Sequence, residues 1–437
     1  MIERYTMPEM AQIWTEENRF KKMLKIEILA CEAMGKIGII PKKDLINIQK
    51  KAKISIKRIQ EIELKTNHDV VAFIWNISEN VGPSAKYVHY GLTSSDVLDT
   101  GLSIQMKEAM DLIIASAKEL QKTIKKQAIK HKKTIMIGRS HGVHAEPISF
   151  GMKMAVWYDE MTRNIERLQQ AEEVISYGKI SGSVGSYANV DPSVEKYVCK
   201  KVGLKPAKAS SQILQRDRHA QYLNAIALLG ASLEKFSTEI RGLQRTETAE
   251  VQEYFSPTQK GSSSMPHKKN PIMCERICGI ARILRANAMA SMENIALWHE
   301  RDISHSSVER VIVPDSTILI HYALRKMIGI MNRLEVNREN MLRNLKISNG
   351  VIFSQHLMLK MIEKGLTRIE AYNIVQTAAL KMYAEKKDFL EAVCEDKKVR
   401  KYMSVEEIKA CGNLNYHIKQ ADTILKQTGI LANKKNK

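Results

Sequence analysis

The sequence predicts an all-α protein, with an elongated central bundle of long helices flanked by two smaller helical domains. The strongest pattern runs from Arg216 to Glu253, where large apolar residues recur at alternating intervals of four and three, which is typical of a long helix packed at a shallow angle against its neighbours. Similar patterns cover about 100–131, 150–175 and 271–300, and few segments alternate with a period of two. We expect four or more long helices, several above about thirty residues, and subunit association that covers their exposed sides. The apolar residues of the strongest pattern are Tyr222, Ile226, Leu229, Leu233, Phe236, Ile240 and Leu243.

Turn-forming residues divide the chain of 437 residues into three predicted domains. The stretch "ENVGPSAKYVHYGLTSSD" ends the first helical segment and "NLKISNG" ends the central one, because Gly, Pro, Asn and Ser interrupt helical patterns. We predict an N-terminal helical domain over 1–92, a central helical bundle over 93–345 and a C-terminal helical domain over 346–437. An apolar content of 44% is ample for a core at this length.

Composition predicts a soluble, cytoplasmic protein. The first ten residues contain no apolar run, and no stretch of about eighteen apolar residues suggests a membrane span. The six cysteines are scattered, so reduced structural thiols are expected. Cys274 and Cys278 have the i,i+4 spacing of a helix, which favours half-buried thiols over a zinc or redox site. No metal site is predicted.

The formal net charge of +20 leaves two interpretations open. A basic balance of this size is compatible with nucleic-acid binding, but the lysines are spread along the chain without interleaved aromatic residues or a recognisable reading motif. We interpret most of them as solvated helix faces, followed by a basic tail, "ANKKNK". A small polyanionic substrate would suit the same charge, so no specific nucleic acid is predicted as a partner.

The stretches between the predicted long helices are longer than structural turns need to be. They are rich in Ser, Thr, His, Asn and Arg, and we therefore expect the functional residues among them. These junctions are "TNHDV" at 66–70, "GLTSSDVLDTG" at 91–101, "GRSHGVHAEP" at 138–147, "GKISGSVGSYANVDP" at 178–192, "SSQILQRDRHA" at 210–220 and "GSSSMPHKKNP" at 261–271.

The junction "GSSSMPHKKNP" ends at the predicted start of a helix, with Asn270 as the N-cap and Pro271 in the first turn. Free backbone N–H groups and the positive end of the helix dipole would favour a bound anion there. A serine acts as a base only if its alkoxide is stabilised, and Lys268, the loop amides and the helix end would supply positive potential. No GxSxG motif is present, so we expect proton abstraction rather than serine-type hydrolysis.

Two histidine motifs are compatible with acid–base chemistry. "GRSHGVHAEP" contains His141 and His144 after Arg139, and "NHDV" places His68 beside Asp69, which could orient it. An imidazole exchanges a proton near neutral pH. Taken alone, however, such motifs are more often structural histidines, weak metal ligands or a polar turn.

Together these motifs resemble the fumarase/aspartase superfamily of lyases and, within it, the adenylosuccinate lyase family. The superfamily signature, two serines followed by Pro, Lys, Asn and Glu at fixed spacing, is matched in full. The matching residues are Ser262, Ser263, Pro266, Lys268, Asn270 and Glu275. The segments "ERYTMPEMAQIW", "TNHDV", "GLTSSD", "GRSHGVHAEP", "SSQILQRDRHA" and "WHERDISHSSVER" are also similar to that family. One departure is Ser140, where the family commonly has Thr, and both residues carry a hydroxyl.

The resemblance implies a role for each matching residue. His141 would be the general acid and Ser262 the general base, although three adjacent serines leave Ser263 open as the base. Glu275 would pair with an imidazole or merely favour the helix start, and His68 would assist near the phosphate. The implied substrate-binding residues are Arg4 and Tyr5 at the phosphate end, Asn67, His68 and Asp69, then Thr93, Ser94, Gln212, Ser263, Lys268 and Asn270 around the fumaryl part, and Arg301, Ser306 and Arg310 on the phosphate side.

The reaction that the resemblance implies is a β-elimination in purine nucleotide biosynthesis. Fumarate leaves adenylosuccinate to give AMP, or leaves the succinylated aminoimidazole carboxamide ribotide (SAICAR) to give AICAR, with no metal or other cofactor. In the family, three subunits of a homotetramer share each active site, so the implied partners are small nucleotides and further copies of the chain, and no membrane. The alternatives are another lyase of the superfamily, such as argininosuccinate lyase or a carboxymuconate cycloisomerase, and a basic helical nucleic-acid-binding protein.

Overall fold

The computed structural model describes residues 1–385 and 387–432. The described chain is predominantly α-helical, which confirms the all-α prediction, and apart from one hairpin its strands are only two residues long. The last five residues of the predicted basic tail, 433–437, lie outside the described part. None of the described helices is long and apolar enough to cross a membrane.

Short helices form the chain before residue 94. They are η1 (Glu3–Tyr5), α1 (Pro8–Ile13), α2 (Glu16–Lys36), α3 (Lys42–Lys51), α4 (Ile56–Thr66), α5 (Asp69–Val81) and η2 (Gly82–Tyr87). Thr15 and Ser55 cap the starts of α2 and α4, and Asn67 ends α4 in a left-handed conformation with φ of 49°. Such caps satisfy backbone groups that a helix end leaves without partners.

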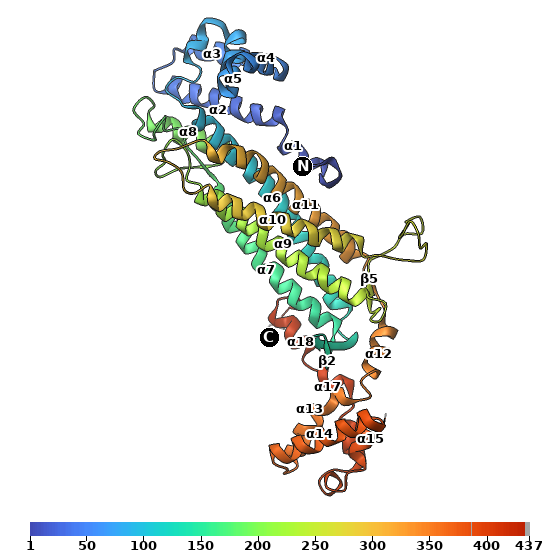
Figure 1. Cartoon of the computed structure of the whole chain (residues 1–437). Coiled ribbons are helices and arrows are strands. Elements are labelled where there is room, and N and C mark those ends of the chain that lie inside the picture. The colour runs from blue at the N-terminus through green and yellow to red at the C-terminus, as the bar shows by residue number, and fades with distance from the viewer. Residues whose placement is uncertain (386, 433–437) are drawn as a thin grey trace. The chain divides into compact units, whose positions relative to one another are not determined.

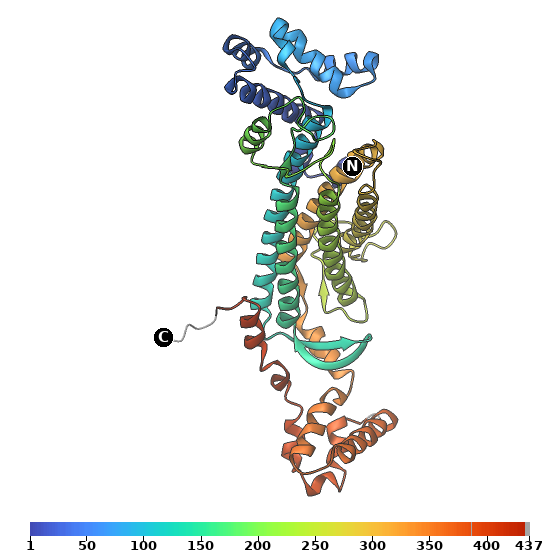
Figure 2. The same ribbon diagram turned by 90° about the vertical axis from the view of Figure 1, so that its left-hand side faces the viewer.

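Five long helices of the described chain form the predicted bundle. They are α6 (Ser94–Lys130), α7 (Phe150–Ile175), α9 (Asp217–Gln244), α10 (Ile272–Glu293) and α11 (Ser304–Asn332), and they run side by side in both views (Figure 1 and Figure 2). The apolar seam of α9 is buried from Tyr222 to Leu243. Hydrogen bonds join the helices, such as the one from the Tyr222 hydroxyl to the Met106 carbonyl of α6 at 2.9 Å.

Two of these helices are shorter than predicted. The helix expected over 216–253 ends at Gln244 and the one expected over 271–300 ends at Glu293, and among the described helices only α6, with 37 residues, exceeds thirty. The apolar spacing stops after Leu243, where "QRTETAE" is polar. The chain turns back there and pairs as β5 (Val251–Gln252) with β6 (Glu335–Val336).

The structure adds a β-hairpin that the helical pattern does not predict. The strands β1 (Ile135–Ser140) and β2 (Val143–Ser149) pair antiparallel, and His141 and Gly142 join them. Both joining residues have positive φ, 55° and 77°, as a two-residue type I′ turn requires. Gly138 lies at the bulge of the hairpin, where an added Cβ would be 2.7 Å from the Glu146 carbonyl oxygen.

The remaining elements are short. They are β3 (Tyr177–Gly178), α8 (Pro192–Val202), β4 (Lys205–Pro206), α12 (Arg338–Lys346), η3 (Val351–Phe353), α13 (Ser354–Glu363), α14 (Arg368–Glu385), α15 (Phe389–Cys394), η4 (Val399–Lys401), α16 (Val405–Ala410), α17 (Leu414–Ile418) and α18 (Ala421–Gln427). The helices after residue 350 enclose a separate apolar cluster that includes Leu357, Met361, Phe389 and Ile408.

The chain forms two compact units that interleave along the sequence. Unit 1 comprises Met1–Lys118, Arg163–Lys235 and Arg276–Lys326, and unit 2 comprises Glu119–Thr162, Phe236–Glu275 and Met327–Lys437. Each of the five long helices passes from one unit into the other, so the units do not follow the consecutive domains 1–92, 93–345 and 346–437. That three-part division stays a prediction.

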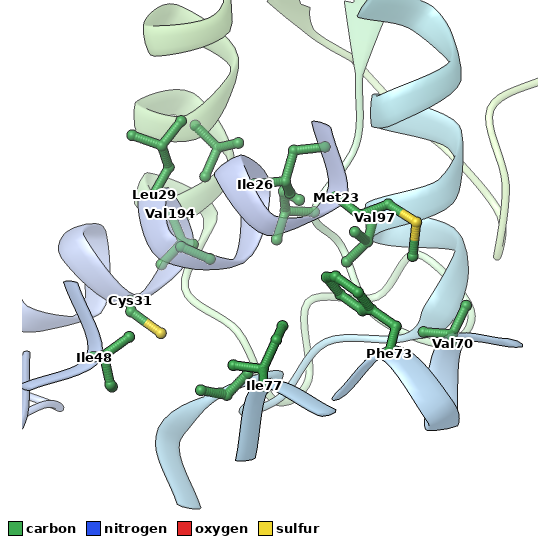
Figure 3. Close-up of a cluster of buried hydrophobic side chains, with 14 of the residues drawn as sticks. Met23, Ile26, Leu29, Cys31, Ile48, Val70, Phe73, Ile77, Val97 and Val194 are labelled. Atoms are coloured by element: carbon green, nitrogen blue, oxygen red, sulfur yellow. The ribbon is translucent and has the colours of Figure 1, made fainter. Parts of the chain in front are cut away.

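Unit 1 has an apolar core around its N-terminal helices. Figure 3 shows Met23 and Ile26 of α2 in one cluster with Phe73 and Ile77 of α5, and each of these side chains is at most 1% exposed. Phe20 of α2 stacks on Phe73 with ring centroids 5.7 Å apart. Burying one such side chain typically contributes about 1.5–3 kcal/mol, so the cluster fixes α2 against α5.

Two of the polar junctions pack tightly together in unit 1. The Lys179 ammonium of "GKISGSVGSYANVDP" forms a fully buried ion pair with the Asp96 carboxylate of "GLTSSDVLDTG". Gly91 lies against Asn189, where an added Cβ would be 2.1 Å from the carbonyl oxygen. The contact leaves no room for a larger residue, which is why glycine is needed there.

Arg216 forms the buried ionic centre of unit 1. Its guanidinium binds both oxygens of Asp99 on α6, at 2.6 and 3.1 Å, and both oxygens of Glu309 on α11, at 2.8 and 3.0 Å. A fifth bond reaches the Leu214 carbonyl at 2.8 Å, so all five guanidinium N–H groups are used. Burial alone would raise the pKa of Asp99, but the Arg216 charge and hydrogen bonds outweigh it and lower that pKa. The cluster joins the starts of α6, α9 and α11.

Two buried histidines border this cluster. Burial, together with the Arg216 charge, lowers the pKa of His219 to about 3 and the pKa of His305 to about 4. The two residues are only 1% and 3% exposed. Both rings are therefore neutral at pH 7 and add no charge to the ionic centre.

Replacing Gly91 with Ala should destabilise the protein more than the same change at Gly203. Both glycines have a similar positive φ, 74° and 75°, so both variants acquire the strain of a left-handed Ala, roughly 1–2 kcal/mol. Nothing lies within 4 Å of an added Cβ at Gly203. Overlap with Asn189 should therefore cost Gly91→Ala about 1–3 kcal/mol more, seen as a lower Tm. Equal Tm values in thermal unfolding would contradict the packing of these junctions.

Acid should weaken the fold through His219. Below its ordinary pKa of 6.5 the unfolded chain gains a proton at this ring, whereas the folded chain does not until the pH approaches about 3. The contribution of His219 to the free energy of unfolding is therefore fully present above about pH 6.5 and is lost as the pH decreases below that value. When the pH is lowered from 7 to 5, the free energy of unfolding should fall by about 2 kcal/mol less in His219→Gln than in the parent protein. Denaturant unfolding at both pH values measures this, and the exposed His299→Gln is the control; an unchanged pH dependence in His219→Gln would refute it.

Candidate active site

Unit 1 contains a cavity of about 320 Å³ beside the starts of α2, α6, α9 and α11. Three residues that the family resemblance assigns to the phosphate side, Arg301, Ser306 and Arg310, line it. Its lining also includes Trp14, Arg19, Asp99, Arg216, His305 and Glu309. The buried ionic centre thus forms part of the cavity wall.

Asp69, the first residue of α5, holds two arginines of this cavity. Its Oδ2 accepts hydrogen bonds from Arg19 Nη2 at 2.5 Å and from Arg310 Nη2 at 3.0 Å. Burial would raise the pKa of Asp69, but the Arg19 and Arg310 charges outweigh it and lower that pKa. His68 Nδ1 accepts the Val71 N–H at 3.4 Å as the N-cap of α5. The cap orients this ring more directly than Asp69 does, because Asp69 Oδ1 is 3.8 Å from Nδ1.

Thr93 and Ser94 form the start of α6. The Thr93 N–H donates to Asp96 Oδ2 at 2.8 Å, which is the return half of a capping box. The same carboxylate is paired with Lys179. Of the residues in this turn, Ser95 lines the cavity, whereas Thr93 and Ser94 are not among its described lining residues.

Arg301 is held from two sides next to the cavity. Its Nη1 donates to Gln212 Oε1 at 3.0 Å and its Nε donates to His305 Nε2 at 3.4 Å. A neutral His305 can accept this bond, in agreement with its lowered pKa. The structure therefore brings Gln212 and Arg301 together with Ser306 and Arg310.

Arg4 and Tyr5 lie in η1, at a different place in unit 1. Tyr5 packs edge-on against Tyr322 with ring centroids 5.4 Å apart, and the Arg276 guanidinium lies 5.6 Å from the centre of the Tyr5 ring. Neither Arg4 nor Tyr5 belongs to the described lining of the cavity. In a single chain, Arg4 and Tyr5 are therefore not part of the cavity wall that includes Arg301.

His141 lies in unit 2, in the turn that joins β1 to β2. Figure 2 draws the two strands of this hairpin as teal arrows. His141 is exposed, and Val143, two positions on, is 66% exposed. A positive φ is uncommon for residues other than glycine, but histidine adopts it more readily than most. The described part of unit 2 therefore presents His141 without enclosing it.

Buried polar contacts hold the base of this hairpin. Arg139 forms a two-point ion pair with the fully buried Glu250, at 3.0 and 2.7 Å, and Asn344 Nδ2 donates to the same carboxylate at 2.8 Å. His144 Nδ1 lies 2.6 Å from Ser348 Oγ. Burial, together with the Arg139 charge, lowers the pKa of His144. Of the two histidines in this motif, His144 is thus bound into the fold and His141 is exposed.

The serine loop of unit 2 turns sharply at Ser262. Its Oγ accepts the N–H of Met265 at 3.1 Å and the N–H of Ser264 at 3.3 Å. Two backbone donors at one oxygen favour the deprotonated form of a hydroxyl. Ser262 is half-buried, whereas Ser263 is exposed. The surroundings of the two candidate bases are therefore different.

Gly261 and Asn270 close the base of the serine loop. Asn270 Nδ2 donates to the Gly261 carbonyl at 3.1 Å. An added Cβ at Gly261 would lie 1.9 Å from the Lys268 carbonyl oxygen, so only glycine permits this approach. The Lys268 side chain is exposed on the same loop.

The start of α10 differs from the predicted anion site. The Glu253 carboxylate accepts the Cys274 N–H at 2.7 Å and the Met273 N–H at 3.3 Å. The predictions that Asn270 caps this helix and that its end binds a substrate anion are therefore wrong, because a carboxylate of the chain already occupies that position. Glu275 lies in the first turn and is exposed.

The cysteines show no arrangement for a metal. Cys274 and Cys278 are buried, and neither forms a disulfide. Among residues 1–385 and 387–432, no group of three or more His, Cys, Asp or Glu side chains is placed to hold a metal ion.

The sequence analysis did not identify five charged residues of the cavity, Glu16, Arg19, Asp99, Arg216 and Glu309. A signal was available for two of them. Asp99 shares a helix face with Met106, seven positions on, and Glu309 shares one with Val313, four positions on. Both of these apolar side chains are fully buried. A charge on an otherwise apolar helix face indicates a buried ionic partner.

Comparison with known proteins identifies the family. A family model described as Lyase matches residues 3–284, and one described as Adenylosuccinate lyase C-terminus matches residues 350–428. The adenylosuccinate lyase of Bacillus subtilis is 51% identical over 430 residues, covering 98% of this chain and 100% of that protein. The adenylosuccinate lyase of Synechocystis sp. is 50% identical over 419 residues, covering 96% and 97%.

The solved structures show the same fold. The 3-carboxy-cis,cis-muconate lactonizing enzyme from Pseudomonas putida has a TM-score of 0.88 at 26% identity, covering 97% of this chain and 96% of that one. The all-α fold is thus of the fumarase/aspartase type. The sequence identity to the two adenylosuccinate lyases is about twice the identity to this lactonizing enzyme, and it selects adenylosuccinate lyase among the lyases considered above. The chain therefore belongs to the adenylosuccinate lyase family and is an enzyme, a carbon–nitrogen lyase.

Proposed function

We propose that the chain releases fumarate by β-elimination from adenylosuccinate, giving AMP, and from SAICAR, giving AICAR. One observation carries the mechanism: two backbone N–H groups bind the Ser262 hydroxyl oxygen. They support an alkoxide, without which a serine is too weak a base. The substrates follow from the two adenylosuccinate lyases that share about half of their sequence with this chain.

Ser262 would remove the proton from the succinyl carbon next to a carboxylate. The electron pair moves into that carboxylate and makes it a dianion, whose stabilisation is the main energetic problem. Lys268 extends from the same loop and is the cation that we assign to this charge, with Ser263 and Asn270 near it. One preorganised donor of this kind is typically worth about 3–4 kcal/mol.

His141 would protonate the leaving nitrogen as the carbon–nitrogen bond breaks. Positioned general-acid catalysis typically gives about 100- to 10,000-fold. The exposed turn that carries His141 suits a residue that must enter a site formed elsewhere, and Glu275 is the carboxylate that we assign to hold the imidazolium.

The cavity of unit 1 would receive the nucleotide. The substrate carries two carboxylates and a phosphate, about −3.5 to −4 at pH 7, and Arg301, Ser306 and Arg310 would bind its phosphate side, with His68 close by. Asn67 and Asp69 would frame this end, and Thr93, Ser94 and Gln212 would hold the fumaryl part. Arg4 and Tyr5 would reach the phosphate from another subunit.

A homotetramer with shared active sites would complete these partial sites. The long helices leave large apolar side chains exposed: Val156 of α7 by 58%, Leu228 of α9 by 52%, Met289 of α10 by 58% and Val311 of α11 by 58%. Exposed large apolar side chains on several long helices favour association. None of the six cysteines forms a disulfide, which suits the reducing cytoplasm, where we place the enzyme in purine nucleotide synthesis.

Ser262→Ala should lower kcat for adenylosuccinate by at least about 100-fold, because the base is lost. Substrate affinity should stay within about tenfold, because the hydroxyl acts mainly in the transition state. The change in ultraviolet absorbance on cleavage reports turnover. Ser256→Ala, in the same loop and bonded to Thr258 at 3.3 Å, is the control and should keep normal turnover. If Ser263→Ala is inactive and Ser262→Ala is active, the base is Ser263.

Mixing two inactive variants should restore activity if different subunits supply the acid and the base. His141→Ala and Ser262→Ala, dissociated and reassembled together, would leave about one quarter of randomly assembled sites with both groups intact. The matched control mixes Ser262→Ala with Lys268→Ala. Both residues belong to the same loop of one subunit, so no exchange of subunits can give a site in which both are intact. Recovery in the control, or none in the first mixture despite proven mixed tetramers, would refute shared sites.

A further inference from the structure

We propose that Arg19 is a further ligand of the substrate phosphate, acting beside Arg310. The proposal rests on the proposed function, since it concerns the phosphate side of the same site. Neither the serine signature nor the histidine motifs point to this residue, which stands in "TEENRFKK" among charges that read as a solvated helix face.

Arg19 reaches the cavity from α2. Its side chain lines the cavity wall with Arg301 and Arg310 and is 29% exposed. Its guanidinium lies 5.1 Å from the centre of the Phe20 ring, and Phe20 is itself buried in the apolar core. The core therefore limits the directions in which Arg19 can point.

Arg19 and Arg310 converge on a single oxygen. Both donate through Nη2 to Asp69 Oδ2, at 2.5 and 3.0 Å. Two guanidinium groups that share one acceptor are close enough to bind oxygens of one phosphate, and the planar donor fork of each suits phosphate geometry. Asp69 thus holds the pair at a suitable separation before the nucleotide arrives.

Donor counting separates these arginines from the fourth arginine of the cavity. All five N–H groups of Arg216 bind Asp99, Glu309 or the Leu214 carbonyl, so Arg216 keeps none for a ligand. Arg19 and Arg310 carry two positive charges, and the carboxylate that both of them bind, Asp69, carries only one negative charge.

The excess positive charge lies at this pair of arginines and not in the cavity as a whole. With Asp69 counted, four arginines and four carboxylates surround the cavity, so their formal charges cancel. Arg216 faces two of these carboxylates, whereas Arg19 and Arg310 share Asp69 alone. The one positive charge in excess at this pair is available to the phosphate.

The test compares AMP and fumarate binding by calorimetry in the assembled protein. Arg19→Gln should weaken AMP binding by about 10- to 100-fold, the loss of a charged hydrogen-bonded contact, and change fumarate binding by less than about threefold. KM for adenylosuccinate should rise similarly while kcat changes little, because the contact persists from substrate to transition state. Arg19→Lys should recover part of the AMP affinity.

Lys22→Gln is the matched control. Lys22 lies one turn further along α2, loses the same charge, and is paired with Glu108 at 2.5 Å outside the described cavity lining. It should leave AMP affinity within about threefold.

Three results would overturn the proposal. Unchanged AMP affinity in Arg19→Gln would do so directly. Equal losses of AMP and fumarate affinity, with no recovery in Arg19→Lys, would make Arg19 a structural residue only. Equal losses of AMP affinity in Arg19→Gln and Lys22→Gln would show that the loss comes from long-range charge and not from a contact with the phosphate. If the parent protein neither binds AMP nor cleaves adenylosuccinate, the proposed function fails instead, which is a different result from each of these.

Discussion

Arg216 and its two carboxylates are buried where water cannot solvate them, and unit 1 is arranged around that constraint. A buried guanidinium without partners costs several kcal/mol, and here every N–H group has an acceptor. The partners come from α6 and α11, and Arg216 directly precedes α9. The positions of three helix starts, and with them the junctions beside the cavity, therefore follow from the bonding of one side chain.

The long helices provide rigid supports and the polar junctions at their ends provide the chemistry. Unit 1 gathers cations around a cavity, while unit 2 presents one exposed histidine on a hairpin and one supported serine on a loop. Each group is held by contacts within its own unit, such as the Arg139–Glu250 pair below the hairpin. Each unit therefore positions its own candidate residues through its own contacts.

Much of the fold is predictable from the sequence because helix packing depends on periodicity. The seam from Tyr222 to Leu243 is buried throughout, and the bundle follows from it. The start of α10 could not be predicted in the same way, because Glu253 acts on it across an intervening loop of the chain. The Arg19–Asp69 contact joins residues fifty positions apart. Such long-range pairs depend on tertiary structure, which neither spacing nor local propensity contains.

The carboxylate at the start of α10 has a consequence for motion. Because Glu253 satisfies the first backbone N–H groups of the helix, the segment between Glu253 and Pro271 is not needed to terminate it. A change in the conformation of this segment would therefore leave these helix N–H groups bonded. Substitutions within the segment can then alter turnover while the start of α10, and with it the bundle, keeps its stability.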